Sequence, residues 1–237
     1  MAAKLSSISR TIPWSLLLRA GIFGAAWLLL PFWLFFLAAL ILYFLPVFQP
    51  LRLILPFALT VFFAGILSPN FWAAALFAAL FFLILGIKNL TLVNRMAAYE
   101  TALFLLLFLA YLNLFFHFPN SGRAAVLLLS GLAAAAYALL LRNAARYATF
   151  PKEWSPRHQA VIFGLAGLLV WQWTWAVLFL PLNPFYQTAL LFLFAAVLTE
   201  MFLDHLAAEL GRRRILGYFS AFVVFASAIL AANPWQL

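Results

Sequence analysis

The chain has no cysteine, a single aspartate and few charged residues of either sign. Without cysteine it can form no disulfide framework, thiol nucleophile or cysteine metal site. Five acidic residues stand against 14 basic ones, and only 8% of the 237 residues are charged. Soluble domains carry about 25% charged residues, so this composition excludes an ordinary water-exposed surface.

Long apolar runs take the place of charge. The chain is 68% hydrophobic, with a mean hydropathy of +1.11. Stretches such as 32–48, 71–87 and 102–116 contain no Lys, Arg, Asp or Glu, and each is long enough as a helix to cross most of a hydrocarbon core of about 30 Å. A membrane β-barrel would alternate polar and apolar residues. The sequence therefore predicts an all-α, polytopic transmembrane helix bundle, one domain over 1–237 with no soluble domain.

Breaks at proline, asparagine and charged residues divide the chain into nine predicted helices. Their ranges are 13–30, 32–48, 51–67, 70–88, 97–117, 123–142, 158–180, 185–206 and 213–232. Pro31 leaves an alternative open, because proline can kink a membrane helix without ending it. In that case 20–48 would form one long helix and the chain would have eight spans.

The basic residues indicate orientation. With nine spans and a cytoplasmic N-terminus, they fall on the cytoplasmic side except for Arg123. With eight spans, the N-terminal tail and Arg52 would face opposite sides. This pattern favours nine spans, a cytoplasmic tail at 1–12, a cytoplasmic loop at 142–158 and an extracytoplasmic C-terminus. The predicted location is a bacterial plasma (inner) membrane, although the basic, serine-rich start also resembles a mitochondrial transit segment.

The same basic residues suggest partners. Arg142–Arg157 and Arg212–Arg214 could contact anionic lipid head groups, as juxtamembrane basic clusters do, or could serve only as topology signals. Since they lie between apolar runs and form no single patch, the sequence predicts no nucleic-acid partner. Other membrane proteins are possible partners.

Acidic residues gather between positions 199 and 214. Measured from Pro184 at the helical rise, Glu200 lies roughly 24 Å along its helix, inside the predicted inner leaflet. Asp204 is one turn further and shares its face, whereas Glu209 and the arginines that follow belong to the aqueous boundary. Ionisable groups within the hydrocarbon need a partner or a role. The predicted intramembrane polar cluster comprises Arg19, Glu100, Glu200, Asp204 and His205.

Other polar and small residues yield weaker predictions. Asn113 and His117, one turn apart, could bond a neighbouring helix or line an outer vestibule. The small residues Gly131, Ala134, Ala135 and Ala138 predict a face buried against other helices.

No sequence motif indicates a particular biochemical activity. The scattered histidines and the lone aspartate form no ligand pattern, so neither a metal nor a cofactor is predicted. The sequence favours a small transporter or a membrane subunit that supports a larger assembly. The alternative is an intramembrane enzyme that acts on lipid-linked or head-group substrates through the inner-leaflet carboxylates.

Overall fold

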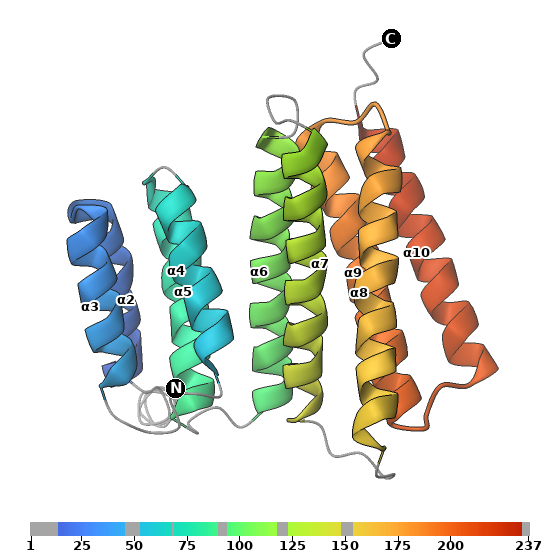
Figure 1. Cartoon of the computed structure of the whole chain (residues 1–237), viewed down its shortest axis with the longest axis horizontal. Helices are drawn as coiled ribbons and strands as arrows, with labels where there is room; N and C mark the ends of the chain where they lie inside the picture. Colours follow the sequence, from blue (N-terminus) through green and yellow to red (C-terminus); the bar gives the residue numbers. More distant parts are fainter. Residues whose placement is uncertain are drawn as a thin grey trace, which may run out of the picture. The chain divides into compact units, whose positions relative to one another are not determined.

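The computed structural model describes residues 14–45, 53–67, 69–89, 94–117, 123–147 and 154–233. Within these ranges all regular structure is helical apart from turns, with nine α-helices and no strand (Figure 1). The all-α prediction is confirmed. The helices are α2 (Trp14–Leu29), α3 (Phe32–Phe44), α4 (Ile54–Ile66), α5 (Phe71–Lys88), α6 (Arg95–His117), α7 (Arg123–Ala145), α8 (Pro156–Leu178), α9 (Pro184–Leu206) and α10 (Arg212–Ala232).

Helix length separates two groups. Six helices, α5 to α10, are long and apolar enough to cross a membrane. The others, α2, α3 and α4, are equally apolar in character but contain 16, 13 and 13 residues. The chain is thus a polytopic helical membrane protein, and complete crossing by the three short helices stays a prediction.

Proline decides two of the helix boundaries. Pro31 separates α2 from α3 and has an extended backbone (φ −58°, ψ 149°), so the alternative of one kinked helix over 20–48 is wrong. The predicted end of α3 at residue 48 is also wrong. Leu45 is extended (φ −97°, ψ 114°) because it precedes Pro46, and the residue before a proline is disfavoured in a helix.

The chain forms two compact units, Met1–Ala102 and Leu103–Leu237, and the division falls inside α6. Each unit packs its own helices. Whether both act as the single transmembrane domain predicted from the sequence stays a prediction.

In the first unit, α2 approaches α5 closely at a glycine. A Cβ on Gly24 would lie 3.1 Å from the Ala74 carbonyl oxygen and 3.2 Å from the Ala78 Cβ. One residue earlier, the ring of Phe23 stacks on that of Phe81, with centroids 4.2 Å apart. Two neighbouring residues of α2, the large Phe23 and the small Gly24, therefore determine how α2 packs against α5.

In the second unit, α7 and α8 make the corresponding close approach. A Cβ on Gly167 of α8 would lie 3.0 Å from the Ala138 Cβ and 3.1 Å from the Ala134 carbonyl oxygen. Ala134 is buried as predicted, but Ala135 is exposed, so the predicted buried face is wrong at that position. Successive helical residues are about 100° apart, and Ala134 and Ala135 cannot both face α8.

Candidate functional site

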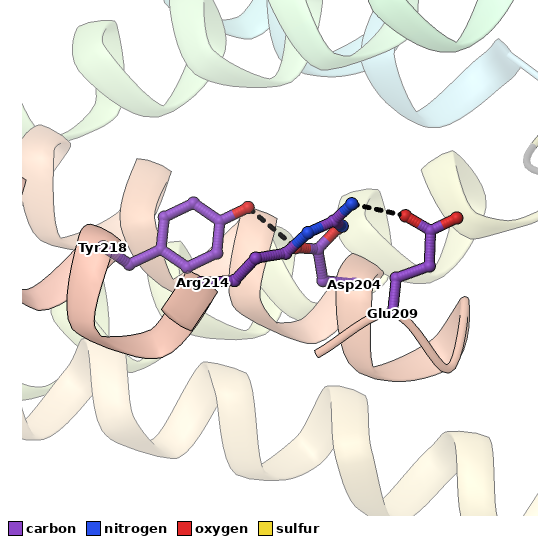
Figure 2. A network of polar contacts seen from close by, with 4 residues as sticks. All are labelled: Asp204, Glu209, Arg214 and Tyr218. Carbon is purple, nitrogen blue, oxygen red and sulfur yellow. Dashed lines mark hydrogen bonds and ion pairs between the residues drawn. The ribbon is translucent and has the colours of Figure 1, made fainter. Parts of the chain in front are cut away.

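Four polar side chains connect the end of α9 to the start of α10 (Figure 2). Arg214 Nη1 lies 2.8 Å from Asp204 Oδ1, and Arg214 Nη2 lies 2.8 Å from Glu209 Oε2. The Tyr218 hydroxyl donates a hydrogen bond of 2.9 Å to Asp204 Oδ2. Both Asp204 oxygens are therefore occupied, and one guanidinium joins two carboxylates.

The turn after α9 positions this network. The Glu209 amide donates to the Asp204 carbonyl (2.9 Å) and the Ala208 amide to the His205 carbonyl (3.1 Å). These are the two hydrogen bonds of a Schellman motif, which ends a helix with one left-handed residue. That residue is Ala208, with φ 58°. The motif reverses the chain, so that Arg214 on the next helix reaches back to both acids.

Burial distinguishes the members of the network. The Asp204 side chain is 16% exposed, compared with 47% for Arg214 and 58% for Glu209. A carboxylate withdrawn from solvent needs a counter-charge, and Arg214 supplies it. Asp204 thus has a structural partner that sequence reasoning had assigned to the aqueous boundary.

Glu200 lies one turn before Asp204 on α9 and is half-buried. It is close enough to Asp204 and Tyr218 to interact with both electrostatically. With the residues that the structure describes, its carboxylate forms neither a hydrogen bond nor an ion pair. Glu200 is therefore the member of this group whose ionisation the network does not compensate.

His205 belongs to an aromatic group that the sequence analysis missed. The ring of Trp154 stacks on His158, with centroids 4.6 Å apart, and lies 5.6 Å from the ring of His205. The Nε1 of Trp154 donates a hydrogen bond of 3.0 Å to the Leu206 carbonyl oxygen. This bond attaches the start of α8 to the end of α9. The available signal was Ser155 before Pro156, a helix start that sets Trp154 just outside α8.

Arg19 and Glu100 belong to the first unit, whereas Glu200, Asp204 and His205 belong to the second. Arg19 Nη1 donates to the Leu45 carbonyl oxygen at 2.8 Å. The meeting of all five residues in one cluster stays a prediction.

Asn113 and His117 are joined within their own helix. His117 Nδ1 lies 2.9 Å from the backbone oxygen of Asn113. The buried Nδ2 of Asn113 has no hydrogen-bond partner among the described residues. An outer vestibule lined by this pair stays a prediction.

Buried hydroxyl groups in the second unit were also missed. The Tyr137 hydroxyl lies 2.9 Å from Thr199 Oγ1 and donates to the Ala195 carbonyl at 3.3 Å, joining α7 to α9. Tyr111 of α6 is equally buried and lies beside Thr174 of α8, but its hydroxyl forms no hydrogen bond of normal geometry. Their sequence signal is tyrosine and threonine within apolar runs.

Comparison with known protein families, curated proteins and solved structures finds no match for this chain. Across the described ranges, no group of three or more His, Asp or Glu side chains is arranged to hold a metal ion. The class of the protein is defined by its helices and composition: a membrane-spanning helical protein with several apolar helices.

Proposed function

We propose that this protein is a membrane-embedded subunit that supports a larger assembly, and that α10 is its contact helix. The observation that carries the proposal is the exposure of α10, where Ala226 is the one buried residue of the helix. One exposed face carries small or short side chains every three or four residues. This α10 stripe comprises Gly217, Ser220, Val224, Ser227 and Ala231.

Small residues favour close helix association in lipid, where no hydrophobic effect draws helices together. A Cβ on Gly217 would meet nothing within 4 Å, so this part of the stripe is open to an approaching helix. The expected occupant is a transmembrane helix of a partner protein.

The hydroxyls of the stripe support the same conclusion. Thr174, Thr188 and Thr199 each donate to the backbone carbonyl one turn earlier. Ser220 and Ser227 make no such bond, nor any other with a described residue. Unsatisfied hydroxyls in hydrocarbon are unfavourable, and a partner helix would offer them acceptors.

Photo-crosslinking tests this proposal. A photoreactive residue replaces Val224 on the stripe or Leu128 on α7, and the protein is irradiated in its native membrane. Both side chains are apolar and 64% exposed, so Leu128 is a matched control for lipid-facing exposure. We expect a protein adduct of defined mass at Val224 alone, and an adduct of twice the chain mass would identify a second copy. Equal labelling at both positions, or lipid adducts alone, would overturn the proposal.

A second candidate is a small proton-coupled transporter, which Glu200 favours. A half-buried carboxylate beside an already paired Asp204 can change its protonation without breaking the Arg214 contacts. In proteoliposomes with an entrapped pH dye, Glu200→Gln should abolish proton flux at normal folded yield. Unchanged flux would remove this candidate. The enzymatic alternative relies on the same carboxylate, and it would require turnover of a lipid-linked substrate that this substitution abolishes.

The proposal places the protein in a bacterial plasma membrane, in the orientation inferred from the basic residues. It includes contacts between anionic lipid head groups and the basic residues of Arg142–Arg157 and Arg212–Arg214.

A further inference from the structure

Two cationic side chains meet the C-terminal end of α3 in the first unit. Arg19 of α2 donates from Nη1 to the Leu45 carbonyl oxygen at 2.8 Å. Lys88, the last residue of α5, donates from Nζ to the Tyr43 carbonyl oxygen and lies 4.4 Å from the centroid of the Tyr43 ring. Carbonyl groups at a helix C-terminus attract cations, which accounts for the position of both.

The charge of this pair is not balanced by the described part of the first unit. Lys88 is 3% exposed and Arg19 is half-buried, yet neither forms an ion pair with a described carboxylate. The two cations are also close enough to repel each other. Carbonyl dipoles and an aromatic face supply only partial negative charge.

The sequence of the first unit has little acid to offer. Its only acidic residue is Glu100, against six basic ones. These are Lys4, Arg10, Arg19, Arg52, Lys88 and Arg95. Since a buried ammonium group needs a nearby negative charge, an anion from outside the first unit is the expected partner.

We infer that Arg19 and Lys88 form a binding site for a phosphate group. The guanidinium of Arg19 uses one nitrogen for Leu45 and keeps further N–H donors, in the planar arrangement that binds two phosphate oxygens. Lys88 is buried and contributes its charge without reaching solvent.

The surroundings of Arg19 favour a phospholipid as the source of this phosphate. Leu18 and Ile22 on the same helix are 62% and 45% exposed. An acyl chain attached to the phosphate would cover these side chains. A free phosphate ion would use the same donors and leave them uncovered.

Native mass spectrometry of the purified full chain tests the site. Protein in detergent is titrated with phosphatidylglycerol or phosphatidylcholine, and retained lipid is measured. We expect preferential retention of phosphatidylglycerol, reduced about tenfold by Arg19→Gln and less by Lys88→Met. The matched control is Arg95→Gln, which removes an exposed arginine of the same unit that has no ion pair to a described residue; retention should not change.

Inorganic phosphate distinguishes the two sources. Release of retained phosphatidylglycerol by millimolar phosphate, sensitive to Arg19→Gln, supports a lipid head group at this site. Phosphate binding with no lipid preference, also lost in Arg19→Gln, supports the site with a free ion as its ligand. The inference is overturned if wild type shows neither preference nor phosphate binding, or if Arg95→Gln causes the same loss as Arg19→Gln.

The variant Arg19→Lys distinguishes a loss of binding from a folding defect, because it keeps the positive charge but loses the planar donors. Phosphatidylglycerol should raise the unfolding temperature of wild type more than that of Arg19→Lys. An equal rise in both would also overturn the inference.

Discussion

Asp204 of α9 and Arg214 of α10 form an ion pair of 2.8 Å across a helical hairpin, and Tyr218 of α10 donates to the second Asp204 oxygen. The three consecutive arginines at the start of α10 are therefore not equivalent. Arg214 bonds two carboxylates, while Arg212 and Arg213 form no ion pair within the described part of the chain.

The first prediction concerns this ion pair. Asp204→Asn and Arg214→Gln should each lower the unfolding temperature in detergent, because either change leaves one partner uncompensated. The double variant should lose less than the sum of the two. Arg213→Gln is the control and should leave the unfolding temperature unchanged. Additive losses would show that the two side chains do not interact in the membrane protein.

A second prediction concerns the left-handed residue of the α9–α10 turn. Ala208 adopts φ 58°, which is strained for a residue with a Cβ. Ala208→Gly should therefore stabilise the protein, by about 1 kcal/mol. Ala207 has φ −74°, and Ala207→Gly should destabilise it. The unfolding temperatures of the two variants are measured in parallel. If both temperatures shifted in the same direction, the assigned turn would be contradicted.

A third prediction compares two glycines of α8. Gly167→Leu should destabilise the protein by about 1–3 kcal/mol, because the new side chain would overlap α7 at Ala134 and Ala138. A Cβ on Gly164 meets nothing within 4 Å, so Gly164→Leu should have little effect. Both substitutions change helix propensity equally. Ala135→Leu should be tolerated as well, since Ala135 is exposed. Folded yield and unfolding temperature measure these differences.

A fourth prediction compares two buried tyrosines. Tyr137→Phe removes the hydroxyl bonded to Thr199 and should destabilise the protein by about 1 kcal/mol. Tyr111→Phe removes a buried hydroxyl without a hydrogen bond of normal geometry and should be neutral or slightly stabilising. Equal destabilisation would mean that Tyr111 has a partner, such as a bound water, in the folded membrane protein.

The last prediction concerns orientation. A reporter fused after Leu237 should be extracytoplasmic if all nine helices cross the membrane and the N-terminus is cytoplasmic. A second reporter, inserted after Ala145, should be cytoplasmic. A cytoplasmic signal after Leu237 would mean either that an odd number of the shorter helices fails to cross or that the N-terminus is extracytoplasmic.

The sequence alone determined the helices and most of their boundaries. Hydrocarbon leaves the backbone no partner but itself, so charge-free runs had to be helical. Proline then located the breaks, as at Pro31, because its ring removes an amide donor and constrains the preceding residue. Asn183 and Pro184 show the same local logic: the asparagine side chain accepts from the Phe185 amide, and the proline occupies the first turn of α9. The one large boundary error, at the end of α3, ignored this effect at Pro46.

Only the tertiary structure decided which polar groups are partners. The pairing of Asp204 with Arg214 depends on the chain reversal at Ala208, where an alanine adopts the conformation usual for glycine. The separation of Ala134 from Ala135 depends on the rotation of α7 against α8, which a row of alanines does not specify. The sequence predicts that Lys88 lies with the other basic residues at the cytoplasmic boundary of the membrane. In the structure it is buried, because α3 ends beside it. Local composition determines which segments are helical and how deep in the membrane their residues are expected to lie. Contacts between helices depend instead on the rotation of each helix about its axis and on close approach at glycines such as Gly24 and Gly167.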